Sequence, residues 1–222
     1  MARALLTLGV MQVYLQFDRP WMPHALAEAA RIAAEHGDWW TEAYAFGYSA
    51  LACALDARAD EGEQYAQRTR AAAERHHDDL LSGLAALAHG WVWLARGQPE
   101  RALAELAPAR DIGCDPHQQH FVGTYVGLSQ FVLGRHSQAA NQWLSSLNLS
   151  ISVGNVRGMA GSIEGCGYLA SRAGEWRTAA RLLAAAQVIR ERAHFPLFKF
   201  WLPHRDAAMH ALRSHLSPAD FE

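Results

Sequence analysis

The sequence predicts an all-α protein made of stacked helical hairpins, and three observations lead to this fold class. One arrangement occurs three times, in which a Gly before a turn is followed twelve residues later by an Ala after it. A Gly-led turn separates the two members of each pair, and no segment shows the alternation that is typical of a β-strand. The pairs are Gly90 with Ala102, Gly127 with Ala139, and Gly167 with Ala179.

A small residue on each of two neighbouring helices allows the helices to cross closely, so a repeated Gly–Ala pair indicates hairpins that pack alike. The same spacing, which we call the repeat frame, extends upstream to Ala25 and Ala66. Val13 and Ala54 stand twelve residues before these alanines, in place of the Gly. The five aligned alanines follow each other at steps of 41, 36, 37 and 40 residues. Such steps suit two helices of four or five turns with short connections.

Five helical hairpins are therefore expected, as a single helical-repeat domain over residues 1–222. Their helix pairs are 4–17 with 22–36, 39–58 with 61–75, 78–96 with 99–110, 117–133 with 136–152, and 156–173 with 175–193. A terminal capping helix is expected at about 199–216, where the helical periodicity resumes after Phe195-Pro196. The spans of the five hairpins are 4–36, 39–75, 78–110, 117–152 and 156–193.

The ends of these helices carry local signals. Gly37-Asp38, the stretch 113–116 and Gly154-Asn155 combine a helix stop with a helix start. Pro99 and Pro116 suit the first turn of a helix, where the missing N–H is not needed. Ser217-Pro218 and Asp220 also form a helix start, which suggests that the chain was cut from something longer.

Composition excludes several functional classes. Half of the 222 residues are hydrophobic and the net charge is −2, so nothing favours direct contact with nucleic acid. No apolar run reaches the length of about 18 residues that spans a bilayer. Ala4 to Leu15 is apolar, but it lacks a signal-peptide cleavage site and is expected to be the first helix. Three widely spaced cysteines fit a reducing cytoplasm.

The twelve-residue spacing resembles that of tetratricopeptide (TPR) repeats, in which a large apolar residue stands four positions after the Ala. Leu106, Trp143 and Leu183 hold that position here. The resemblance implies a right-handed α-solenoid of about five TPR-like hairpins whose first helices line a concave face. The repeats here are longer than the 34 residues of the TPR pattern.

A second resemblance covers about the last 50 residues. The run from Gly174-Glu175-Trp176 to Arg190-Glu191-Arg192 looks like the terminal TPR-like region of large bacterial regulators. That family combines a P-loop ATPase module with a LuxR-type, cyclase or winged-helix output domain. No Walker A sequence and no recognisable DNA-reading helix occur in these 222 residues. The resemblance therefore implies that any ATPase and DNA-binding domains lie elsewhere.

Counting from the aligned Gly and Ala places a set of aromatic and polar residues on the concave face. Aromatic side chains with a few polar groups suit a groove that binds an apolar ligand and orients it by hydrogen bonds. Alternatively, each ring packs between hairpins. The candidate groove residues are Tyr14, Phe17, Tyr48, Arg58, Leu87, Trp91, Phe121, Thr124, Leu128, Glu164, Tyr168 and Arg172.

Metal and catalytic sites find little support. His117 with His120 and the cluster from His76 to Asp79 contain ligand types, but neither has a third ligand at a convincing spacing. Cys166 stands beside a predicted helix crossing, where a small apolar side chain is wanted. No metal, cofactor or catalytic residue is therefore expected. One of the adjacent Trp39 and Trp40 should be partly exposed, since neighbours on a helix point about 100° apart.

These observations predict a binding domain rather than an enzyme. The first hypothesis is a domain of a bacterial signalling or transcriptional regulator that binds a protein segment or a small-molecule inducer on its concave face. The alternative is a stand-alone TPR-like adaptor that scaffolds a protein complex. The ligand, the output domain and the oligomeric state do not follow from the sequence.

Overall fold

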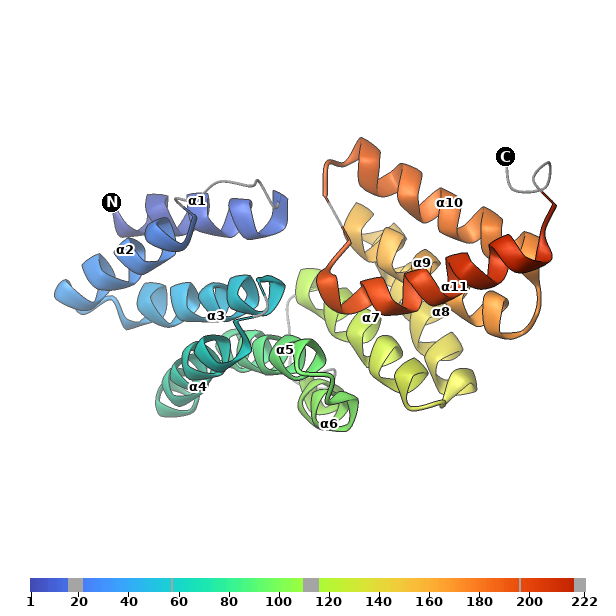
Figure 1. Ribbon diagram of the computed structural model, residues 1–222. Helices are drawn as coiled ribbons and strands as arrows, with labels where there is room; N and C mark the ends of the chain where they lie inside the picture. The colour runs from blue at the N-terminus through green and yellow to red at the C-terminus, as the bar shows by residue number, and fades with distance from the viewer. Residues whose placement is uncertain (16–21, 57, 110–115, 196, 218–222) are drawn as a thin grey trace. The chain divides into compact units, whose positions relative to one another are not determined.

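The computed structural model describes residues 1–15, 22–56, 58–109, 116–195 and 197–217, and within these residues the fold is all-α with no strand (Figure 1). The chain divides into two compact units, Met1–Gln118 and Gln119–Glu222. Each unit is built from consecutive helices joined by short turns. The expectation of one continuous repeat domain over 1–222 stays a prediction.

The first unit contains three predicted hairpins in chain order. Neighbours in sequence pack against each other, and the first helix of each hairpin also packs against that of the next. Its helices are α1 (Ala2–Leu15), α2 (Met22–Glu35), α3 (Trp39–Leu55), α4 (Ala59–His76), α5 (Asp79–Ala95) and α6 (Pro99–Ala109).

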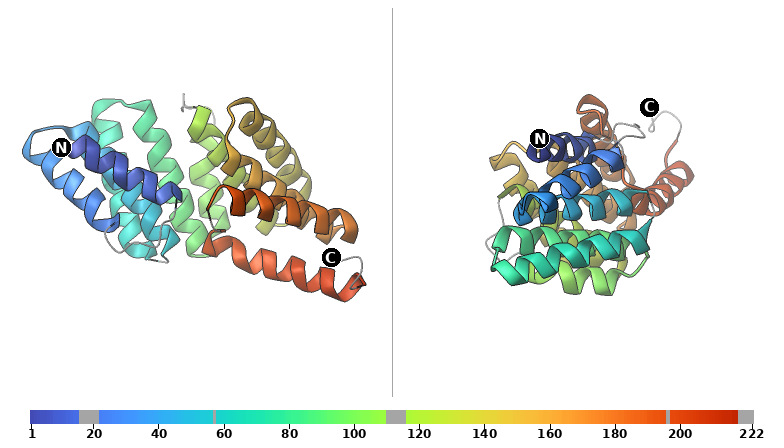
Figure 2. Two further views of the ribbon diagram at one scale, coloured as in Figure 1. Left: turned by 90° about the horizontal axis from the view of Figure 1, so that it is seen from above. Right: turned by 90° about the vertical axis from the view of Figure 1, so that its left-hand side faces the viewer.

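The second unit contains the other two hairpins and the predicted C-terminal helix. A short 3₁₀ turn leads directly into that last helix, which packs against α9 and α10. The path of each hairpin can be followed by its colour in Figure 2. The helices are α7 (Pro116–Val132), α8 (His136–Ser152), α9 (Val156–Arg172), α10 (Trp176–Arg192), η1 (Lys199–Trp201) and α11 (Leu202–His215).

The predicted helices are confirmed, with ends that differ by a few residues. Phe17, the stretch 113–115 and residues 218–220 lie outside the described residues, as does the side chain of Tyr14. Trp39 is 37% exposed and its ring stacks on that of His76 at 3.7 Å, so the expected exposure of one of the two adjacent tryptophans is confirmed.

Side-chain caps start the first helices of three hairpins. Asp38 accepts a hydrogen bond from the backbone N–H of Thr41, and Asp78 accepts one from Leu81 at 2.8 Å. Asn155 accepts one from the N–H of Gly158 at 2.9 Å. Each bond satisfies an N–H that the first helical turn leaves without a partner, so these residues fix where α3, α5 and α9 begin.

The repeated glycines make room for the large side chain of the following helix. A Cβ atom added to Gly90 would lie 2.5 Å from Leu106, and one added to Gly127 would lie 2.5 Å from Trp143. At Gly167 it would lie 2.8 Å from Leu183. The aligned Ala102, Ala139 and Ala179 are fully buried. The close contact at each crossing is therefore between the Gly and the residue four positions after the Ala.

His77 ends α4 in a backbone conformation that favours glycine. Its φ is +52°, whereas Gly37, Gly97 and Gly154 occupy the same left-handed region at other helix ends with φ of +68°. Because a Cβ atom is strained in this region, we expect His77→Gly to raise the free energy of unfolding of the first unit by about 0.5–1 kcal/mol. Urea denaturation measures the change. Gly97→Ala should lower that free energy, and a lower stability of His77→Gly would contradict the argument.

Candidate functional site

In the first unit, the predicted groove residues lie in the packed interior or in ion pairs. Tyr48, Leu87 and Trp91 are buried. Arg58 is half-exposed and donates to Glu61 at 2.6 Å, and to Asp56 at 3.4 Å. These four residues therefore take part in core packing and ion pairing within this unit.

In the second unit, all but one of the predicted residues on α7 and α9 are buried, and Arg172 is exposed. Phe121, Thr124 and Leu128 lie on α7 and are buried, as are Glu164 and Tyr168 on α9. The two helices approach closely, because Gly161 leaves room for the Thr124 methyl group: a Cβ atom on this Gly would lie 2.9 Å from it.

Trp201 inserts its indole among the aromatic residues of α7, α8 and α9. Its ring centroid lies 6.2 Å from Tyr125, 6.4 Å from Trp143 and 5.9 Å from Tyr168. The next turn brings His204 edge-on to Phe131 at 5.8 Å. Within the second unit, the C-terminal segment thus lies across the predicted binding face, as α11 does across α7 and α9 in Figure 1.

A buried carboxylate ties this segment to α9. Glu164 is 0% exposed and accepts hydrogen bonds from Arg190 on α10 and from Arg205 on α11, the latter at 2.9 Å. The hydroxyl group of Tyr168 donates to the same carboxylate at 3.0 Å. Burial, together with the Glu164 charge, raises the pKa of Tyr168, so the phenol stays protonated and acts as a donor.

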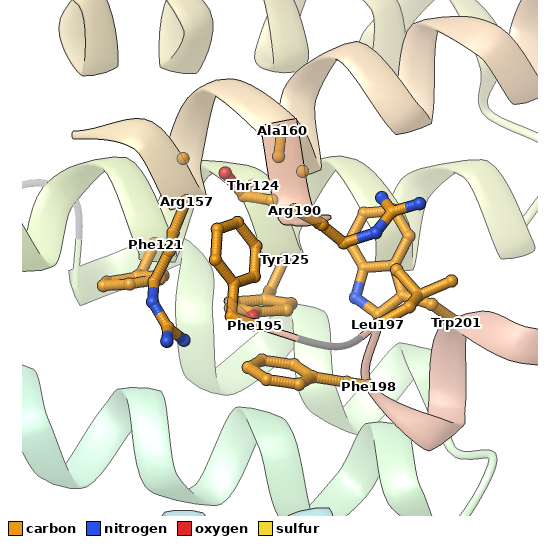
Figure 3. A pocket seen from close by; sticks show the side chains of 12 residues that line it. Phe121, Thr124, Tyr125, Arg157, Ala160, Arg190, Phe195, Leu197, Phe198 and Trp201 are labelled. Atoms are coloured by element: carbon orange, nitrogen blue, oxygen red, sulfur yellow. The ribbon is translucent and has the colours of Figure 1, made fainter. Parts of the chain in front are cut away.

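One pocket lies beside this network, and Figure 3 shows the rings of Phe121, Tyr125, Phe195 and Phe198 around it. The guanidinium group of Arg157 lies 4.5 Å from the centre of the Phe195 ring. The cavity measures about 40 Å³. It has room for about two or three water molecules, which is too little for a ring-sized ligand.

A larger groove lies between the α9–α10 turn and α11. Its volume is about 450 Å³, and two of the predicted residues, Tyr168 and Arg172, line it. Alanines from α11 form one wall, and aromatic rings form much of the rest. The other lining residues are Phe131, Val132, Ser171, Trp176, His204, Ala207, Ala208 and Ala211.

Burial lowers the pKa of His204 below its ordinary value, because the groove wall disfavours the charged imidazolium. In the unfolded chain the ring titrates near pH 6.5. The stability that the neutral ring contributes is therefore complete above about pH 6.5 and is lost as the pH falls below that value.

We expect His204→Phe to flatten the pH dependence of stability in the second unit between about pH 6.5 and 5. The loss attributable to His204 is at most about 1.4 kcal/mol per pH unit. Urea denaturation of both proteins across this range measures the difference. Parallel pH profiles of the two proteins would contradict the assignment to His204.

The thiol groups of Cys53 and Cys166 are not activated. Burial raises the pKa of Cys53 to about 11, and it also raises the pKa of Cys166. A thiol of this kind stays protonated at neutral pH and is a poor nucleophile. Among the residues that the structure describes, no group of three His, Cys, Asp or Glu side chains could hold a metal ion.

The sequence did not point to the residues that complete this region. Arg190, Trp201, His204 and Arg205 contact the predicted α9 residues but were not predicted as site residues. The density of apolar residues from Phe195 to Trp201, beyond the last repeat, was the available signal for a segment that packs on another surface.

Comparison of the chain with protein-family models finds no matching family, and comparison with curated proteins finds no relative. Within the described part of the chain, no helix is long and apolar enough to cross a membrane. The fold and the geometry of the second unit therefore carry the functional argument.

Proposed function

We propose that this chain is a ligand-binding helical-repeat domain of a bacterial signalling or transcriptional regulator. The ligand site is the groove between the α9–α10 turn and α11. One observation carries this proposal: Tyr168 and Arg172, which the repeat frame assigns to the ligand-facing side of α9, line the same groove of about 450 Å³.

The fold behind this proposal is a right-handed α-solenoid of TPR type. The order in which helices pack within each unit supports it, as do the three equivalent crossings at Gly90, Gly127 and Gly167. The resemblance of the C-terminal part to bacterial regulators adds a cytoplasmic location, with ATPase and DNA-binding activities assigned to other domains.

The groove favours a small molecule over a protein segment as the ligand. Trp201 and Arg205 already contact the α7 and α9 face, at Tyr125 on α7 and at Tyr168 and Glu164 on α9. The remaining open volume falls in the range of about 300–1,000 Å³ that is usual for small-molecule sites. An adaptor that binds a peptide on this face would first have to displace the C-terminal segment.

Binding in this groove offers a way to signal. A ligand there contacts Trp176 at the start of α10 and Ala207 on α11 at the same time. It therefore stabilises the conformations in which both helices contact the ligand, and it raises the population of these conformations. The position of α11 is the change that other domains would detect.

Ligand-dependent thermal stability of the purified chain tests this function. A panel of metabolites is screened against the wild type, against Ala207→Trp, which fills the groove, and against His210→Trp as the control. Ala207 and His210 are both exposed on α11, but His210 does not line the groove. We expect a compound that raises the melting temperature of the wild type and the control but not of Ala207→Trp. A stabilising compound that acts equally on all three would refute the groove as the site.

A further inference from the structure

We propose that the groove selects small compounds with a flat apolar body and a single carboxylate, and that Arg172 binds the carboxylate. This inference rests on the proposed function, because it names the chemical class of the ligand for the same groove. It follows from two properties of the lining residues, the shape of the apolar walls and the balance of charge.

The walls of the groove suit a planar ring system. Phe131, Tyr168 and Trp176 contribute aromatic side chains, and Ala207 and Ala211 on α11 contribute small ones. The Trp176 ring also stacks on His215, with ring centroids 4.1 Å apart. Small side chains together with aromatic ones leave apolar space, in which a ligand ring would bury its surface. A volume of about 450 Å³ admits one or two fused rings with a substituent.

The charge of the groove is positive. Of the described residues that line it, none is acidic, and burial keeps His204 neutral at pH 7. Arg172 is exposed and makes no hydrogen bond or ion pair with any residue that the structure describes. A guanidinium group with this freedom at the edge of an apolar groove matches a ligand carboxylate, to which it can donate two parallel hydrogen bonds.

The neighbouring groove between α10 and α11 lacks this property. It measures about 280 Å³ and is lined by Gln187, Glu191 and Arg205 among apolar residues. Its charged groups already have partners, since Arg205 pairs with Glu164 and Glu191 accepts a hydrogen bond from Gln187 at 2.7 Å. Of these two grooves, the one lined by Arg172 offers the charge for anion recognition.

Three probes separate the contributions of shape and charge. Naphthalene-2-carboxylate carries the proposed combination, naphthalene-2-carboxamide keeps its shape without the charge, and acetate keeps the charge without the ring. Isothermal titration is carried out on the full chain, on Arg172→Gln and on Arg181→Gln. Arg181 is an exposed arginine on α10 that does not line the groove, so its variant controls for the loss of one positive charge.

We expect the carboxylate probe to bind the wild type and Arg181→Gln with equal affinity, and Arg172→Gln about five- to tenfold more weakly. The carboxamide should bind all three proteins alike and more weakly than the carboxylate binds the wild type. Raising the salt concentration should weaken binding of the carboxylate but not of the carboxamide, because ions screen the exposed guanidinium charge.

The groove-filling variant Ala207→Trp distinguishes two questions: whether the groove binds a ligand at all, and whether it selects carboxylates. If both naphthalene probes bind equally well and Ala207→Trp abolishes both, the groove is a ligand site but the selection of carboxylates is refuted. If the carboxylate binds with unchanged affinity to Arg172→Gln, the role of Arg172 is refuted. If no naphthalene probe binds, the proposed ligand class is wrong, and the metabolite panel decides whether the groove binds another class.

Discussion

Replacing Glu164 by Ala is expected to lower the free energy of unfolding of the second unit by about 3–5 kcal/mol. The carboxylate is fully buried and is the shared partner of Arg190 and Arg205. Its removal leaves two largely buried guanidinium groups without their counter-charge, and it also removes the acceptor of the Tyr168 hydroxyl. Hydrogen exchange of the α9 and α10 amides and urea denaturation measure the loss.

The matched control is Glu191→Ala on α10. Glu191 is exposed and accepts one hydrogen bond from Gln187, so its loss should change the stability by no more than about 0.5 kcal/mol. Equal effects of the two substitutions would show that burial of Glu164 and its pairing with two arginines are not what stabilises this unit. Glu164→Gln should also be strongly destabilising, because it retains the shape but not the charge.

The second large effect is expected for Trp143→Ala, with a loss of about 3–5 kcal/mol in the same unit. The indole is fully buried, and its Nε1–H donates to the backbone oxygen of Thr124 at 3.0 Å. Its ring packs between Gly127 on α7 and Gly165 on α9, where an added Cβ atom would meet it. Truncation leaves a cavity at the point where three helices meet. Urea denaturation measures the change.

Leu144→Ala provides the comparison for Trp143→Ala. Leu144 is the next residue of α8 but is exposed, so its truncation should have little effect. Gly165→Ala should destabilise the wild type and be better tolerated in the Trp143→Ala background, because the atoms that it would meet are those of the indole. Additive effects of these two substitutions would contradict the close contact between ring and glycine.

The all-α fold and the packing of helices in chain order could be predicted because the helix crossings share one sequence pattern. Each crossing needs a Gly opposite one large side chain, and this requirement recurs at Gly90, Gly127 and Gly167. The starts of α3 and α9 could also be predicted, because Asp38 and Asn155 cap these helices through local hydrogen bonds. The division into two compact units has no such signal.

The site could be predicted only in part. The frame places Arg172 and Val132 at equivalent positions, five residues after the aligned Gly, and both line the groove. It also places Trp91, Leu128 and Tyr168 at equivalent positions one residue after that Gly, and all three are buried. Trp201 and Arg205 follow the last repeat, so the frame says nothing about where they pack.

The segment from Phe195 to His215 would lower the apparent affinity of any partner that binds the α7 and α9 face. It is tethered to α10 by a short connection, so it presents Trp201 to the α7 and α9 face at an effective concentration of the order of millimolar. A free peptide for the same face competes with this internal occupant, and its apparent affinity falls by the fraction of molecules whose face is open. Weak apparent binding to the intact domain is thus compatible with a strong intrinsic site.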